Sequence, residues 1–208
     1  MVGAMEQASL AAAKFREIED QFDKPQPVLE RLKAAYSEPH RRYHTLSHIL
    51  EMLDCFSQSP DLAEDRTALS LAIWFHDVVY DPTSPPGANE AASAELLEEM
   101  AKGRAVAPAI RMILHSAHHD VSADPDTQLF CDLDLYRLGV DEEAFLQHDD
   151  DVRFEYRHVS DADWRVGRAA FLDNMLARPT IYQTRHWRDR CEKQARRNLA
   201  AACARLMA

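Results

Sequence analysis

A histidine and an aspartate stand side by side inside an apolar stretch of the sequence, at His76 and Asp77. From Ala68 to Val79 nearly every other residue is apolar, which predicts a helix that is buried on most sides and continues to about Tyr80. Burying a polar group without a partner costs roughly 2–7 kcal/mol, so both side chains need compensation. Buried charges persist when they are paired or bind a metal ion. The pair therefore indicates a divalent metal site, with a hydrogen-bonded core pair as the alternative.

Two further side chains could complete such a site. His44 lies in the sequence Arg-Tyr-His, and Asp134 lies in Asp-Leu-Asp-Leu. With His76 and Asp77 they give two imidazoles and two carboxylates, a mixed donor set that suits a borderline or hard divalent ion. Neighbouring residues on a helix diverge by about 100°, so His76 and Asp77 can share one ion only if it sits over the edge between them. Other helices must then supply ligands, leaving open positions for water and substrate.

The order His, then His-Asp, then Asp resembles the HD superfamily of metal-dependent phosphohydrolases. The similarity is densest from Arg41 to Gly139, and it is closest to a branch of predicted hydrolases with Arg-Tyr-His near the first ligand. It implies a hydrolase that uses metal-activated water on a nucleotide or another small phosphorylated metabolite. The implied cofactor is one divalent ion, which could be Mn, Mg, Fe, Co, Ni or Zn. The implied metal ligands are His44, His76, Asp77 and Asp134.

Two positions compete with these ligands. Asp132 is also followed by leucine, but two residues apart on a helix Asp132 and Asp134 point about 200° away from one another, so only one should ligate. The family pattern favours Asp134. His48 follows His44 by one helical turn, and we expect it to support the ligands or pack in the core, with ligation as the alternative.

Several titratable residues are candidates for catalysis. Asp77 could assist proton transfer, and the resemblance to HD nucleotidases, which carry an acid soon after the His-Asp pair, implies the same role for Glu90. Glu90 follows a Pro-rich loop and could instead complement a helix dipole. His115, His118 and His119 form a cluster in which two side chains share a helix face. They could bind substrate phosphate, hold a second metal ion or lie solvated at a helix end. Within the cluster we select His115 for catalysis and His119 for substrate binding.

Arginines could bind the phosphate group of a substrate. A guanidinium group donates forked hydrogen bonds that match phosphate oxygens, but each arginine could equally be structural. The candidates are Arg41, Arg42 and Arg153.

The pattern along the chain is helix after helix, without the two-residue alternation of a strand. We expect an opening helix over 5–22, long helices near 141–158, 161–177 and 184–206, and a capping box at Asp61 and Glu64 before the buried helix. The predicted fold class is all-α: a single HD-type multi-helix bundle over residues 1–208. Its motif core is 41–139, and the C-terminal helices of 141–206 pack on that core.

Composition narrows the possible functions. A net charge of −11 argues against nucleic-acid binding, and the 5 glycines form no phosphate-binding loop. The cysteines are scattered, the N-terminus does not resemble a signal peptide, and no apolar stretch approaches the ~20 residues that span a bilayer. We therefore expect a cytoplasmic protein without a membrane partner. Two other functions stay open: a di-iron HD-type oxygenase with a bridging Asp77, and a non-catalytic helical module that binds a nucleotide or a protein.

Overall fold

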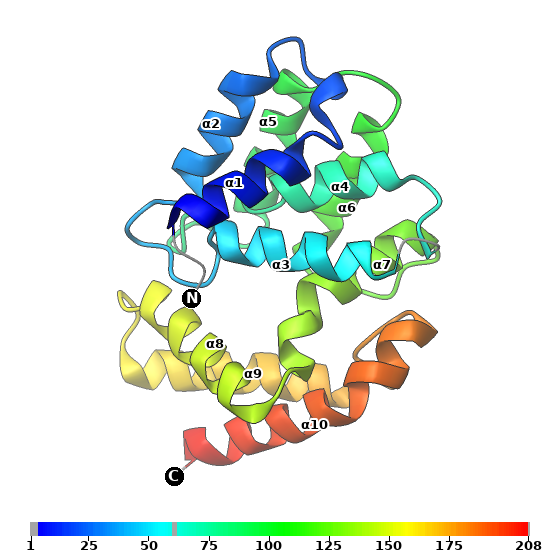
Figure 1. The fold of residues 1–208 in the computed structure, drawn as a ribbon. Coiled ribbons are helices and arrows are strands. Elements are labelled where there is room, and N and C mark those ends of the chain that lie inside the picture. Colours follow the sequence, from blue (N-terminus) through cyan, green and yellow to red (C-terminus); the bar gives the residue numbers. More distant parts are fainter. Residues whose placement is uncertain (1–3, 60–61, 208) are drawn as a thin grey trace. The chain divides into compact units, whose positions relative to one another are not determined.

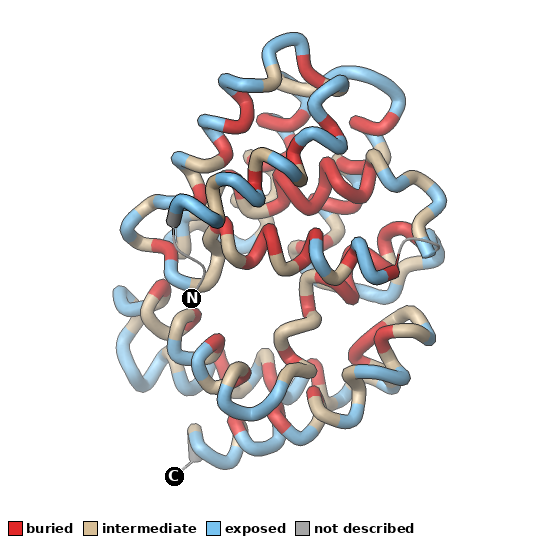
Figure 2. The backbone as a smooth tube through the Cα atoms, viewed as in Figure 1, coloured by how far each residue is buried: buried red, intermediate tan, exposed pale blue. Residues whose placement is uncertain are grey.

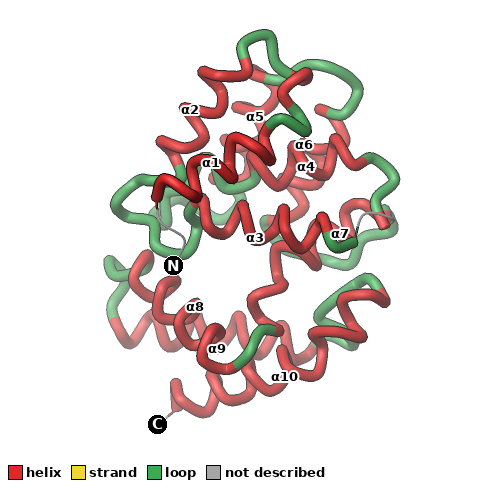
Figure 3. Tube along the Cα trace, viewed as in Figure 1, coloured by secondary structure: helices red, strands yellow, loops and turns green. Residues whose placement is uncertain are grey.

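A computed structural model describes residues 4–59 and 62–207. These residues form ten α-helices, and Figures 1 and 3 show that the described chain is built from helices and loops. Its only β pairing is an isolated bridge between Phe22 and Ala101. The predicted all-α fold class is therefore confirmed. The α-helices are α1 (Ala4–Phe15), α2 (Pro25–Ala35), α3 (Leu46–Ser57), α4 (Arg66–Phe75), α5 (Ala88–Met100), α6 (Val106–Ser116), α7 (Pro125–Asp134), α8 (Glu142–Glu155), α9 (Asp161–Ala177) and α10 (Arg185–Met207).

The chain divides into two compact units, Met1–Phe130 and Cys131–Ala208. The boundary falls inside α7, so a helix and not a loop connects them. None of the helices in the described part of the chain is both long enough and apolar enough to cross a membrane.

Helix α4 forms the centre of the first unit, where it packs on α3, α5 and α6. All its residues from Ala68 to Phe75 are buried, as the colouring of Figure 2 shows. A helix that is apolar on every side must be surrounded by other elements, which explains its central place. Its N-cap is Asp65, whose carboxylate accepts a hydrogen bond from the Ala68 N–H. The expected cap at Asp61 lies outside the described residues.

The end of α4 differs from the expectation. The helix stops at Phe75 and does not continue to Tyr80. His76 is its C-cap, and the Val78 N–H turns back to the Phe75 carbonyl. The carbonyls of Asp77 and Val78 accept hydrogen bonds from the Arg41 side chain, a tertiary contact that competes with helix continuation.

The second unit is built from α8, α9, α10 and a short 3-10 helix, η3 (Leu135–Gly139). Helix α10 packs on both α9 and η3. The close approach of α10 to η3 depends on Gly139, where an added Cβ atom would lie 2.6 Å from Cys191 Cβ and 2.7 Å from Tyr182 Oη. On the same face, the buried Asn198 amide donates to the carbonyls of Leu138 (2.9 Å) and Val140 (2.8 Å).

Candidate metal centre

The turn after α4 brings the side chains of His76 and Asp77 together. His76 Nε2 lies 2.9 Å from Asp77 Oδ2. On a continuous helix these neighbours would diverge by about 100°. Because α4 ends at Phe75, the two side chains can face each other. His76 is only 2% exposed, whereas the Asp77 side chain keeps 17% of its surface, so solvent reaches the pair from the carboxylate side.

His48 joins this pair from α3. Its Nε2 atom lies 3.8 Å from the same Oδ2 of Asp77, and its ring centroid is 5.4 Å from that of His76. One ligand atom of each of His48, His76 and Asp77 lies within 4.8 Å of the others. His48 is 2% exposed and occupies the buried face of α3, which packs on α4. These three residues could hold a metal ion, and we call them the metal-binding group for that reason.

The hydrogen bonding of His76 sets which of its ring nitrogens could bind an ion. Its Nδ1 lies 3.0 Å from the Ile73 carbonyl oxygen, which can only accept, so Nδ1 carries the proton. Nε2 is then the ring nitrogen that faces Asp77 Oδ2, so it is the atom through which His76 could bind a cation. His48 Nε2 lies 3.8 Å from the same oxygen and offers a second imidazole nitrogen to a shared ion. Metal-binding histidines commonly hold their other nitrogen on a carbonyl in this way.

His44, the ligand that the motif implies, lies beside the group and just before α3. Its ring centroid is 6.2 Å from that of His48, and its ring stacks on Tyr80 at 4.3 Å. The ligand role of His44 stays a prediction, and from this segment the metal-binding group takes His48. The helical register could have indicated this: His48, Met52 and Phe56 follow one another at intervals of four along the buried face of α3.

The two aspartates near the unit boundary differ in their surroundings. Asp132 is fully buried, and its carboxylate oxygens accept hydrogen bonds from the N–H groups of Gln183 (2.6 Å) and Thr184 (2.7 Å), just before α10. Burial raises the pKa of Asp132 to about 6 against the lowering effect of these bonds. A carboxylate engaged in this way is a poor candidate ligand, which favours Asp134. Asp134 is the last residue of α7 and belongs to the second unit, and its ligand role stays a prediction.

The three candidate arginines have different surroundings. Arg41 is buried and donates to main-chain carbonyls, including those of Asp77 and Val78. Arg153 donates to the carbonyl of Tyr156 (2.7 Å) and to Asp161 (2.7 Å), so it braces the turn between α8 and α9. The Arg41 side chain is fully buried by its contacts, whereas the Arg153 side chain is 28% exposed and its role in phosphate binding stays a prediction. Arg42 is exposed and stays a predicted phosphate-binding residue.

Glu90 lies in the first turn of α5, where its charge complements the helix dipole. The Pro-rich loop before it is closed by Asn89, whose side chain exchanges hydrogen bonds with the backbone of Asp81. A role of Glu90 in proton transfer stays a prediction.

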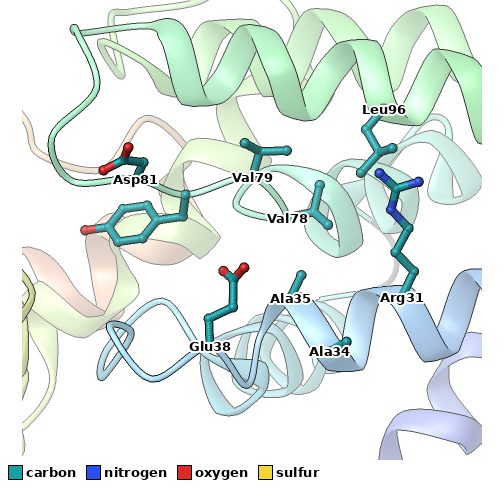
Figure 4. Close-up of a pocket in the computed structure, with 9 residues that line it drawn as sticks. Arg31, Ala34, Ala35, Glu38, Val78, Val79, Asp81 and Leu96 are labelled. Atoms are coloured by element: carbon teal, nitrogen blue, oxygen red, sulfur yellow. The ribbon is translucent and has the colours of Figure 1, made fainter.

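A cavity of about 410 Å³ lies between α2 and α5 (Figure 4). One wall is the segment 78–81, which begins immediately after Asp77, and the charged side chains around it are those of Arg31, Glu38 and Asp81.

The histidine cluster closes the C-terminal end of α6. His115 Nε2 donates to the Asp120 carbonyl at 2.8 Å, and the His119 N–H donates to the His115 carbonyl at 3.2 Å. His119 has a left-handed backbone with φ of 48°, which is uncommon for a residue with a side chain. His118 is exposed. The backbone thus favours the helix-end interpretation, and the catalytic role of His115 and the substrate-binding role of His119 stay predictions.

The sequence was compared with known proteins. No family model matches it, and no curated protein and no solved structure matches it. The interpretation of the site therefore depends on the residues of this chain and their geometry.

Proposed function

We propose that this protein is a metal-dependent phosphohydrolase acting on a nucleotide or another small phosphorylated metabolite. The observation that carries the proposal is the metal-binding group: two buried imidazoles and a partly exposed carboxylate within 4.8 Å of one another. The resemblance of the sequence to the HD superfamily supports it, since His76 and Asp77 are the pair that gives that family its pattern.

The residues of the chain have separate tasks in this proposal. A divalent ion held here would lower the pKa of water and polarise a phosphoryl oxygen. His76 is kept in the ligating tautomer by the Ile73 carbonyl, and His48 offers a second buried nitrogen. Asp77 supplies the negative charge, and its side chain is the one that keeps solvent exposure, at 17%. Glu90 would transfer a proton, and His115 would offset charge on the phosphoryl oxygens.

The test compares the wild-type protein with Asp77→Asn. Each protein is stripped with a chelator and reloaded separately with Mn²⁺, Co²⁺, Ni²⁺ or Mg²⁺. Phosphate release is then measured from a panel of nucleotides, sugar phosphates and an aryl phosphate. We expect one metal ion per wild-type chain and metal-dependent hydrolysis of at least one compound. Asp77→Asn, which keeps the shape of the side chain and removes its charge, should abolish both.

Asp54→Asn is the matched control, because Asp54 is an exposed carboxylate on α3, the helix that carries His48. It should behave as the wild type. Hydrolysis is excluded if the metal-loaded protein releases phosphate from no compound. Two irons per chain after reloading with Fe²⁺, together with oxygen consumption, would instead support the oxygenase alternative.

A further inference from the structure

One arginine side chain contacts both segments that carry the metal-binding group. Arg41 lies between α2 and α3, and its guanidinium group is fully buried. Nη1 donates to the His44 carbonyl at 3.2 Å and to the Asp77 carbonyl, and Nη2 donates to the Val78 carbonyl at 2.9 Å. A single side chain therefore joins the segment leading into α3 to the turn that follows α4.

The charge and the plane of this guanidinium group are both fixed. Its Nε donates to Glu38 Oε2 at 2.9 Å, which balances the buried charge. Its central carbon lies 5.4 Å from the ring centroids of Tyr36 and of Tyr80, within the range of cation–π attraction. Tyr80 in turn stacks on His44. Because Nε, Nη1 and Nη2 all donate hydrogen bonds within the protein, the side chain is held in one orientation and is not available to a substrate.

The turn over 76–80 needs such support because it lies beyond the end of α4. Its backbone carries Asp77, whose carboxylate must stand opposite His48 of α3 for the two to share an ion. We propose that Arg41 is the positioning residue of the metal-binding group: it fixes the Asp77 peptide relative to the segment that leads to His48. This inference rests on the metal site of the proposed function, and it does not depend on the hydrolytic reaction.

Lysine cannot replace this arginine fully. An ammonium group is a compact charge, whereas the planar guanidinium group reaches several carbonyls in fixed directions while lying over aromatic rings. Loss of residues that orient metal ligands typically weakens metal binding roughly 10–100-fold. We expect Arg41→Met to weaken binding within this range, Arg41→Lys to weaken it less, and Glu38→Gln least, because Glu38 is 43% exposed and touches only Nε of the guanidinium group.

The experiment titrates Co²⁺ into the wild type, Arg41→Met, Arg41→Lys and Glu38→Gln, with isothermal titration calorimetry for affinity. The visible absorption spectrum of each loaded protein is recorded as well, because it reports the coordination geometry of Co²⁺. Displacement of Asp77 should alter that spectrum in both Arg41 variants. A purely structural arginine would lower the melting temperature and leave affinity and spectrum unchanged.

Arg168→Met is the matched control. Arg168 is also buried, pairs with Asp149 at 2.6 Å and lies over the rings of Trp164 and Phe171, but in the second unit. The Arg168→Met protein should have a lower melting temperature than the wild type but the same Co²⁺ affinity and absorption spectrum.

The possible outcomes separate the two proposals. Wild-type affinity and spectrum in folded Arg41 variants would overturn the positioning role. If Arg41→Met does not fold, the Co²⁺ affinities and spectra of Arg41→Lys and Glu38→Gln test the positioning role in its place. A wild type that binds Co²⁺ but hydrolyses no phosphoester would overturn the reaction alone, and a wild type that binds no Co²⁺ would overturn both.

Discussion

At Asp77, one carboxylate oxygen faces the Nε2 atoms of two histidines, His48 on α3 and His76 at the C-cap of α4. The importance of His76 and Asp77 could be predicted from the sequence, because a polar pair within an apolar segment needs compensation. The third partner could not be assigned in the same way. His44 and His48 are four residues apart in the sequence, and only the structure shows that His44 lies before α3 while His48 lies on its buried face, 3.8 Å from Asp77.

Substitution of each histidine tests this assignment. We expect His48→Gln to weaken Mn²⁺ binding by more than the roughly 10–100-fold that is typical of an outer partner, because it removes a ligand nitrogen. His44→Gln should have a smaller effect, since the His44 ring contacts the group by stacking. Calorimetric titration with Mn²⁺ gives both affinities. The reverse order would support His44 as the ligand that the motif implies.

At the scale of single elements, the sequence predicts where helices occur better than where they end. The apolar residues of α4 predict its buried face, but its end at Phe75 depends on carbonyl contacts from a distant arginine. The expected opening helix over 5–22 is likewise divided after Phe15, and the ring of Phe22 stacks back on Phe15 at 5.4 Å. Such tertiary contacts are absent from the local pattern.

The close packing of η3 on α10 predicts opposite effects for two glycines of the second unit. Gly139→Ala should destabilise the protein by roughly 1–3 kcal/mol, because the new Cβ would overlap Cys191 and Tyr182. Gly167→Ala should stabilise it by roughly 0.5–1 kcal/mol, since Gly167 lies within α9 with no atom near the added methyl group. Urea unfolding measures both changes. Equal effects of the two substitutions would contradict the packing argument.

The buried carboxylate of Asp132, which accepts hydrogen bonds from Gln183 and Thr184 just before α10, predicts that folding stability depends on pH. Burial raises the pKa of Asp132 to about 6, compared with about 3.9 for an unfolded aspartate. Between these values the folded chain holds a proton that the unfolded chain has released, so stability falls as the pH rises from about 4 to 6. The free energy of unfolding should drop by up to about 3 kcal/mol in this window.

This pH effect is measured as the difference between the wild type and Asp132→Asn in urea unfolding at pH 4, 5, 6 and 7. The difference should follow the titration of Asp132. Asp150→Asn, which removes an exposed carboxylate from α8, should run parallel to the wild type. Parallel curves for Asp132→Asn as well would show that this carboxyl is not linked to folding.

For the whole molecule, the all-α class could be predicted because helix-forming residues and apolar periodicity agree along the chain. The division into Met1–Phe130 and Cys131–Ala208 could not, because the boundary lies within α7 and has no break in composition to mark it. The expectation of one continuous domain over 1–208 stays untested as a statement about independent folding.

The location of the metal-binding group in the first unit predicts a metal-dependent stability. An ion that binds the folded state at 100 times its dissociation constant stabilises it by about 2.7 kcal/mol. For a chain of this size, the midpoint temperature of the thermal transition that includes the first unit should rise by roughly 5–10 °C. Calorimetry with Mn²⁺ and with a chelator measures the shift. Asp77→Asn should lose it, and an equal shift in that variant would place the ion elsewhere.

The contacts of Arg41 end on main-chain oxygens of His44, Asp77 and Val78, and every amino acid carries such an oxygen. Evolution can therefore exchange some side chains along these stretches without disturbing the contacts. It cannot add or delete a residue between 41 and 44, or between the end of α4 and 78, without moving a carbonyl out of reach. Conservation here should appear as invariant spacing, and a one-residue insertion should be more damaging than a conservative replacement.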